Sequence, residues 1–237
     1  MTAQTSTAHD DHATEKTQRR YDRQAVLYEV MDWPFEFVVF GKLRRQLWAD
    51  VLGNTVLEVG VGTGKNLAYH PEGIRIVAVD LSPRMLRRAI ARAERTARNI
   101  DFILADAEHL PFRDEAFDCA AATFVFCSVP DPVAGLWEAR RVVRDGGRLN
   151  LLEHVRAPNS LLGWLMDRLN PIAVRLTGAN INRDTVSNVG KADIQVDSME
   201  SKGLGIIRLI RGLRPRNARA GAEDTGEISR ILRRKGS

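Results

Sequence analysis

A short β-branched strand that runs directly into a glycine-rich turn constrains the fold of this 237-residue chain more than any other feature. The stretch covers residues 55–64 and reads TVLEVGVGTG, with glycine at Gly60, Gly62 and Gly64. Glycine allows backbone with positive φ and leaves no Cβ to hold a ligand away, so main-chain N–H groups can approach a bound molecule. The stretch therefore predicts a buried strand followed by a nucleotide cradle.

Two other glycine motifs do not fit this turn. A phosphate-binding loop needs four residues between its first glycine and a Gly-Lys-Ser/Thr sequence. Gly60 and Gly64 enclose three residues, and Lys65 is followed by Asn66. A dinucleotide fingerprint would need glycine at position 65 or 67, where the chain has lysine and leucine. An ordinary strand-to-helix turn remains as the alternative, and the segments that follow argue against it.

Those segments repeat a pattern of strand followed by acid. Ile74–Asp80 is an apolar run of the buried-strand type that ends in an acid, and Ser82-Pro83 is typical of a helix start. A third strand is expected at Ile100–Leu104, shortly before Asp106, and a fourth at Phe117–Phe124. An acid at the end of the second strand can accept hydrogen bonds from both hydroxyls of a ribose. The order predicts an α/β fold with an adenosine-containing ligand along the carboxyl ends of parallel strands.

The rest of the chain adds elements of the same kind, to a total of seven strands. The expected elements are a helix at residues 131–144, a turn at 145–147, a strand at 148–155, a helix start at 182–185 and two short strands at 194–196 and 205–210.

Several stretches then carry a family resemblance. LEVGVGTG, VAVDLSPRML, DAEHLPFRDEAFD and EARRVVRDGGRL resemble successive motifs of the class I S-adenosylmethionine (SAM)-dependent methyltransferases, in the branch of the ubiquinone and menaquinone C-methyltransferases. The resemblance covers roughly residues 20–212. FCSVPDP, LLEHVRAP and NINRDT are also similar to segments of alkyl-thiol S-methyltransferases and of some bacterial phospholipid N-methyltransferases.

The resemblance implies SAM as the cofactor and a Rossmann-like, doubly wound, seven-stranded sheet, mostly parallel with an antiparallel last strand. It implies that Glu58 and the glycine turn hold the methionine part of SAM, and that Asp80 holds the ribose. Leu81 and Ala107 would pack against the adenine, and Asp106 would accept a hydrogen bond from its exocyclic amine.

Composition and resemblance together divide the chain into three parts. Residues 1–16 are polar and are expected to form a disordered tail. The methyltransferase domain is expected at residues 17–212, and a basic tail follows it at residues 213–237. Residues 17–52 read as two helices, at 17–31 and 34–52, that form an N-terminal lid. In the resembling family this segment folds over the cofactor pocket, which makes Tyr21 and Tyr28 candidate lid contacts.

An insertion at residues 157–190 is expected to select the acceptor. Its first part is apolar, and Pro171 is expected to kink or split it into two short helices that cover the acceptor or dip into a lipid interface. The alternative is a pair of helices packed on the domain itself. Trp164 and Arg183 are the candidate acceptor contacts, because a guanidinium can hold a phosphate or carboxylate bidentately.

The net charge of +5 and the isoelectric point near 9.5 would suit a nucleic-acid partner. The basic residues, however, are spread over helix faces, as at Arg44 and Arg45, where charges are usually solvated. Nucleic acid is therefore not the expected partner. The arginine-rich C-terminus suits a solvated tail first, an anionic membrane surface second and RNA third.

The sequence also predicts where the protein works. No apolar run reaches the roughly 18 residues that a spanning helix needs, and the N-terminus does not resemble a secretory signal. A cytoplasmic protein is expected, with peripheral membrane contact left open. Cys119 and Cys127 have no neighbours at metal-ligand spacing, so no metal site is expected.

Methyl transfer from SAM needs only a small contribution from a catalytic base. Orienting two bound reactants supplies about 7–11 kcal/mol, whereas a general base contributes about 10²–10⁴-fold. His154, at the end of the fifth strand, is the base candidate, against the alternative of a structural hydrogen-bonding role. Cys127 is a second candidate, for which a structural role is favoured. We expect an enzyme that methylates a small lipophilic acceptor (a quinol, phospholipid amine or thiol); the alternative is a catalytically silent SAM-binding module that acts through its basic tail on RNA or a protein partner.

Overall fold

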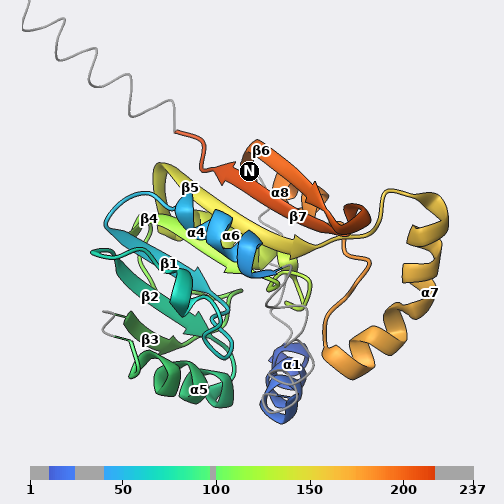
Figure 1. The fold of residues 1–237 in the computed structure, drawn as a ribbon, viewed down its shortest axis with the longest axis horizontal. Helices are drawn as coiled ribbons and strands as arrows, with labels where there is room; N and C mark the ends of the chain where they lie inside the picture. The colour runs from blue at the N-terminus through green and yellow to red at the C-terminus, as the bar shows by residue number, and fades with distance from the viewer. Residues whose placement is uncertain (1–10, 25–39, 97–99, 217–237) are drawn as a thin grey trace, which may run out of the picture.

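The apolar runs pair into one seven-stranded sheet with the order β3-β2-β1-β4-β5-β7-β6 (Figure 1). The computed structural model describes residues 11–24, 40–96 and 100–216. The strands are β1 Thr55–Val59, β2 Arg75–Asp80, β3 Ile100–Leu104, β4 Phe117–Thr123, β5 Val143–His154, β6 Gln195–Lys202 and β7 Ile207–Leu213. β1 to β5 pair in parallel, and β7 runs antiparallel to both β5 and β6. The predicted Rossmann-like sheet with an antiparallel last strand is confirmed.

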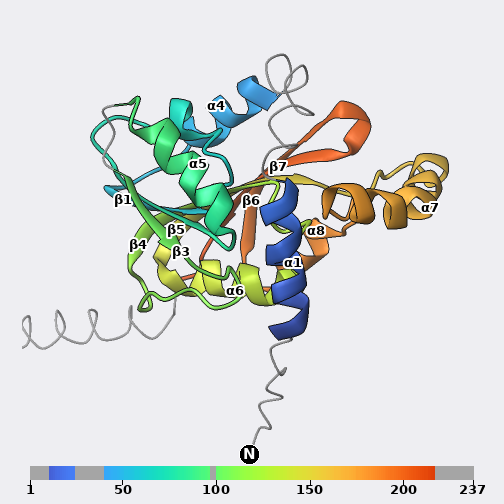
Figure 2. The ribbon, with the colours of Figure 1, turned by 90° about the horizontal axis from the view of Figure 1, so that it is seen from below.

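Each face of the sheet has its own hydrophobic core, because successive strand residues point to opposite sides. In β1, Leu57 and Val59 pack with residues of α6 (Pro132–Val142) and α8 (Thr185–Lys191). Val56 packs on the other face with residues of α4 (Gly41–Ala49) and α5 (Pro83–Ala93). Figure 2 shows helices on both faces. The sheet is therefore doubly wound, as predicted.

The direction of winding changes at β1, which lies between β2 and β4. In open α/β sheets a crevice forms outside the carboxyl ends of the strands at such a switch point, and ligands bind there. The glycine turn predicted as a nucleotide cradle follows β1 directly and therefore lies at this crevice.

Side-chain caps fix the starts of the helices that follow the strands. Ser82 accepts a hydrogen bond from the Met85 N–H at 3.1 Å, and Asp131 accepts from Val133 and Ala134. Each cap is followed by proline at the first helical position, where the missing N–H costs nothing. The helix starts predicted at Ser82-Pro83 and at residue 131 are thus observed.

The N-terminal helix begins earlier than the sequence predicts. α1 covers Asp11–Gln24, so residues 11–16 are helical and do not belong to a disordered tail. An Arg19–Glu15 ion pair of 3.2 Å, one helical turn apart, favours this extension. Residues 1–10, Tyr28, the predicted start of the second helix at Pro34 and most of the basic tail, 217–237, lie outside the described residues.

Two predictions of local breaks are wrong. The turn predicted at residues 145–147 lies inside β5 as an irregularity in its pairing with β4. There Gly146 has φ +71° and donates to the carbonyl of Arg214, the residue after β7, which supports the distorted backbone. Pro171 does not split the insertion, because α7 is one helix over Ser160–Thr177. A proline removes a single helical hydrogen bond, and Asp167 and Asn170 tie the middle of this helix to residues 180–182.

Candidate active site

A cavity opens at the carboxyl ends of β1, β2, β4 and β5. It is bordered by the glycine turn, by the residues that follow β2, β3 and β4, and by side chains of α1 and α4. Most of the residues predicted to bind SAM meet here, namely Gly60, Gly62, Asp80, Leu81, Asp106 and Ala107, together with His154 and Tyr21.

The three glycines of the turn have positive φ but differ in their surroundings. A Cβ on Gly60 would lie 2.4 Å from the Val125 side chain, and one on Gly64 would lie 3.1 Å from the Cα of Ala89 in α5. Gly64 therefore serves helix packing, and it does not line the cavity. A Cβ on Gly62 would meet nothing within 4 Å. Gly62 is the position where bare backbone borders open space.

Asp80 ties the second strand to this turn. One carboxylate oxygen accepts from the Gly62 N–H at 2.8 Å and the other from the Ser82 N–H at 2.9 Å. Burial raises the pKa of Asp80 to about 6, against the opposing effect of these two backbone bonds. A carboxylate has about four acceptor positions. Two remain for hydroxyl donors in the cavity, which fits the predicted ribose contact.

Glu58 does not line the cavity, contrary to the prediction that it holds the methionine part of SAM. Its side chain is fully buried, with Oε1 accepting from Asn66 Nδ2 at 2.7 Å and Oε2 bonded to His70 Nε2 at 2.9 Å. The role of Glu58 is to hold Asn66 and His70. Asn66, which Glu58 holds, itself lines the cavity.

Arg44 is the cavity residue that the sequence prediction missed. It was expected on a solvated helix face, but it is buried and lines the cavity. Its Nη1 donates to Asn66 Oδ1 at 2.7 Å, and its guanidinium lies 5.8 Å from the centre of the Phe124 ring. The sequence does indicate that Arg44 is buried, because residue 44 falls on the same helical stripe as Phe40, Leu43 and Leu47. Arg44 brings a positive charge to the end of the cavity formed by Asn66.

Two aromatic rings lie beside His154, and one of them, Phe124, is the ring that Arg44 approaches. His154 stacks on Phe124 with ring centres 4.3 Å apart, and Phe40 meets Phe124 edge-on at 5.0 Å. Phe124 has φ +58°, and its N–H donates to the Leu152 carbonyl at 2.7 Å. This strained residue is held so that its ring borders the cavity beside His154.

Glu153, the neighbour of His154, holds the loop after β4 through backbone hydrogen bonds. Its carboxylate accepts from the N–H groups of Val125, Phe126 and Cys127 at 2.9–3.3 Å. Burial raises the pKa of Glu153 to about 7. Burial also raises the pKa of the Cys127 thiol, which lies behind this loop and does not line the cavity. The favoured structural role of Cys127 agrees with its position.

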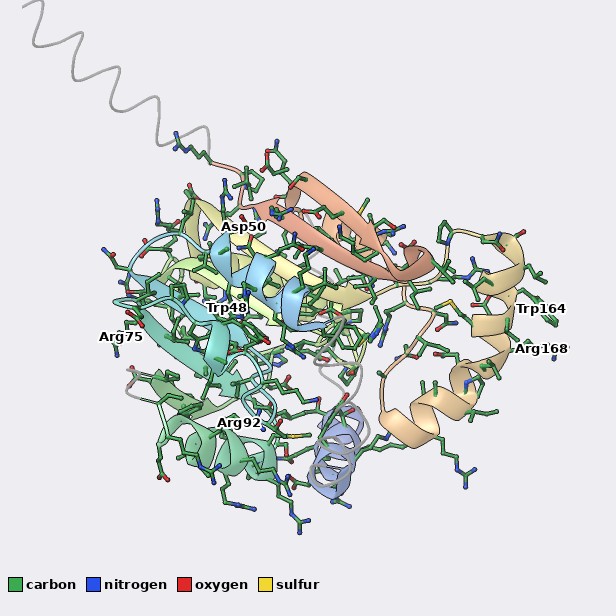
Figure 3. All side chains as sticks on the ribbon, viewed as in Figure 1. Trp48, Asp50, Arg75, Arg92, Trp164 and Arg168 are labelled. Atoms are coloured by element: carbon green, nitrogen blue, oxygen red, sulfur yellow. The ribbon has the colours of Figure 1, made fainter. Side chains whose placement is uncertain are left out.

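The two candidate acceptor contacts do not reach the cavity. Arg183 donates to the Val129 carbonyl at 2.9 Å and so supports the loop after β4. Burial lowers the pKa of Arg183. Trp164 is half exposed and points away from the sheet (Figure 3). It faces outward because Met166, on the opposite side of α7, is buried, and Asn170 anchors the helix to Asn180 and Ile181.

α1 covers one side of the cavity, as expected of a lid. Thr17 and Tyr21 line the cavity, and Gln18 donates to the Leu81 carbonyl at 3.0 Å. Asp22 accepts from the Ser82 hydroxyl at 2.6 Å. α1 is therefore attached to the segment that follows Asp80.

Comparisons with known proteins agree with this geometry. A family profile described as a methyltransferase domain matches residues 57–151. A demethylmenaquinone methyltransferase of Clavibacter sepedonicus is 32% identical over 202 residues, which are 72% of this chain and 80% of that protein. This chain belongs to the class I SAM-dependent methyltransferases. The methyltransferase is also 32% identical to a rat thiol S-methyltransferase over 62% of each chain, and 35% identical to a phosphatidylethanolamine N-methyltransferase of Cereibacter sphaeroides over 52% of this chain and 64% of that one.

Solved structures show the same fold. A SAM-dependent methyltransferase from Thermotoga maritima superimposes with a TM-score of 0.63 at 25% identity, over 83% of the methyltransferase and 99% of that chain. A geranyl diphosphate methyltransferase in complex with sinefungin superimposes with a TM-score of 0.60, over 73% of this chain and 76% of that one. None of the named relatives supports the alternative of a silent binding module. Several curated relatives are covered over only about half to two-thirds of their own length.

The residues that line the cavity of the methyltransferase fit SAM, its cofactor, in their chemistry. Open space lies beside the bare backbone of Gly62, and acceptor positions remain on Asp80. Among the described residues, no group of three or more His, Cys, Asp or Glu side chains is arranged to hold a metal ion. In the same part of the chain, no helix is long and apolar enough to span a membrane.

Proposed function

We propose that this methyltransferase methylates a small lipophilic acceptor of the kind named in its relatives: a quinol, a phospholipid amine or a thiol. The observation that carries the proposal is the aromatic wall of Phe40, Phe124 and His154 beside the cofactor end of the cavity. Rings of this kind can pack against the apolar or planar part of an acceptor and can also face a cationic amine. SAM supplies a methyl group that its sulfonium already makes strongly electrophilic.

We assign the cofactor contacts by position. Asp80 accepts hydrogen bonds from the ribose, Leu81 and Ala107 pack against the adenine, and Asp106 accepts from its amine. Gly62, whose N–H is bonded to Asp80, offers bare backbone where the ribose continues into the methionine part. Arg44 and Asn66 take over there the role predicted for Glu58, since they reach the cavity and Glu58 does not. Arg44 pairs with the methionine carboxylate, because a guanidinium matches a carboxylate in charge and shape.

We assign the role of base to His154, because its ring lines the cavity and an imidazole can take the proton that a thiol, phenol or ammonium acceptor loses. The remaining work of the site is orientation and exclusion of water. The α1 lid, held by Gln18 and Asp22 against residues 81–84, closes the adenosine side.

A panel of acceptors tests the proposal. Full-length protein is incubated with SAM and a demethylated quinol, phosphatidylethanolamine or an alkyl thiol, and formation of S-adenosylhomocysteine is measured. We expect turnover with one class and much less with the others. Turnover on a charged, water-soluble amine in preference to all three classes would contradict the proposal.

A further inference from the structure

An amphipathic surface helix normally turns its apolar side inward, but α7 does the reverse. Its outward side carries five large exposed apolar residues: Leu161, Trp164, Leu165, Leu169 and Ile172. Leu161 is 73% exposed and the other four are 44–57% exposed. At 3.6 residues per turn these five fall within an arc of about 140°. We refer to this set as the α7 face.

The polar side of α7 is the side that holds the helix to the domain. Asp167 accepts from Arg156 at 2.9 Å and from Asn182 at 3.0 Å, and Asn170 bonds with Asn180 and Ile181. Met166 is buried, and its sulfur accepts from the Ala157 N–H at 3.4 Å. These contacts fix the rotation of α7 about its own axis, so the fold itself holds the apolar face outward.

The charges near this face are positive. Arg168 and Arg175 fall in the same arc, and the guanidinium of Arg168 lies 5.5 Å from the centre of the Trp164 ring. The helix contains one acid, Asp167, which is paired with Arg156 on the anchored side. An apolar helix face with arginine and tryptophan at its border is typical of a helix that lies in the surface of an anionic bilayer.

A second apolar projection lies beside the start of α7. The tip of the β6–β7 hairpin carries Leu204, which is 86% exposed and has φ +56°. A branched side chain in this left-handed conformation costs about 1–2 kcal/mol compared with glycine. Gly205, its neighbour, packs against Pro158, two residues before α7. The exposed leucine and the α7 face therefore lie at the same edge of the molecule.

This edge adjoins the cavity. Gly178 ends α7 and lies against Arg20 and Tyr21 of α1, and Tyr21 lines the cavity. The hairpin tip directly precedes Ile207, which pairs with His154 at the end of β5. Figures 1 and 2 show α7 beyond the carboxyl ends of the parallel strands.

We propose that the α7 face, with Leu204, docks this methyltransferase onto an anionic lipid bilayer at the edge where the cavity opens. α7 lies along the surface of the bilayer and does not cross it. A second copy of the chain fits the face less well, because pairing two such faces would bring four arginines together with no acid on either face. The proposal rests on exposure and charge alone, so it does not depend on which acceptor is methylated.

Vesicle flotation of the full-length protein tests the docking. We expect the protein to float with vesicles of phosphatidylcholine and phosphatidylglycerol, and to float much less with phosphatidylcholine alone. The double variant Leu165→Ser/Ile172→Ser should weaken binding about tenfold or more, and Arg168→Gln/Arg175→Gln about fivefold per arginine on anionic vesicles only. The matched control is Trp137→Ser, which removes a tryptophan of similar exposure from α6 and should leave binding unchanged.

Fluorescence gives an independent readout. Anionic vesicles should shift tryptophan emission to the blue, and Trp164→Phe should abolish this shift whereas Trp137→Phe should preserve it. Flotation that is equal in the wild-type protein and the α7 variants would overturn the proposal, because another basic segment would then carry the binding. Sedimentation showing a wild-type dimer that the α7 variants disrupt, without vesicle binding, would also overturn it in favour of a self-interface.

Discussion

Substitution of Gly62 by alanine separates cofactor binding from folding. Gly62 has φ +56°, and an added Cβ would meet nothing within 4 Å, so the protein itself has room for the methyl group. That room borders the cavity, where the backbone is proposed to receive the methionine part of SAM. The variant should therefore fold but exclude its cofactor.

The magnitudes follow from the local geometry. Alanine at positive φ should lower the free energy of unfolding by about 1–2 kcal/mol. A methyl group forced into space that the ligand occupies costs about 1–3 kcal/mol, which corresponds to about 5- to 150-fold in the dissociation constant for SAM. Gly60→Ala should be the less stable variant, because its Cβ would lie 2.4 Å from the Val125 side chain.

Gly73→Ala is the matched control. Gly73 has φ +76°, is exposed, has nothing within 4 Å of an added Cβ and does not line the cavity. It should lose the same stability as Gly62→Ala in urea denaturation and keep wild-type affinity in calorimetric titration with S-adenosylhomocysteine. If Gly62→Ala bound this ligand as tightly as Gly73→Ala does, the glycine turn would not be the cradle.

Four further predictions address individual side chains. Burial raises the pKa of Asp80 to about 6, so the acceptor carboxylate is protonated below that pH. The affinity for S-adenosylhomocysteine, measured by titration, should therefore fall about tenfold per pH unit below pH 6. An affinity that stays constant down to pH 5 would contradict the ribose contact. Arg44→Gln should weaken cofactor binding about 10- to 100-fold by calorimetry, whereas its exposed neighbour Arg45→Gln should not; equal effects would remove Arg44 from the site. Because Glu153 has a folded pKa of about 7 against an ordinary 4.5, its favourable contribution to stability is complete below pH 4.5 and is lost as the pH rises through 7. Glu153 should contribute a fall of up to about 3 kcal/mol in urea denaturation at several pH values. Glu153→Gln should remove this part of the fall and leave the part due to Asp80; an unchanged slope would refute this origin. His154→Gln should lower kcat by about 10²–10⁴-fold with little change in the dissociation constant for SAM; unchanged kcat in single-turnover assays would exclude the base role.

The features that the sequence predicts well are those whose cause is local. The β-branched runs, the acid at the end of β2 and the Ser-Pro and Asp-Pro helix starts each follow from residues within a few positions of one another. Once the order of these elements is known, the rules for parallel α/β sheets bring Gly62, Asp80 and Asp106 to one edge.

The features that sequence alone misses depend on contacts between distant segments. Glu58 lies next to the glycine turn in sequence, yet Asn66 and His70 occupy both of its oxygens, so a different residue reaches the cavity. Arg44 is buried through its bond to Asn66. Trp164 faces outward because the other side of α7 is anchored by residues that follow the helix. None of these partners can be read from the spacing of the residues concerned.

A crystal structure of the full-length protein with S-adenosylhomocysteine tests the central claim most directly. The account predicts the ribose hydroxyls within hydrogen-bond distance of Asp80, the adenine between Leu81 and Ala107, the carboxylate of the ligand near Arg44, and the ligand in contact with the bare Cα of Gly62. A ligand bound elsewhere, or an Asp80 carboxylate that contacts only Gly62 and Ser82 while the ligand is present, would contradict it.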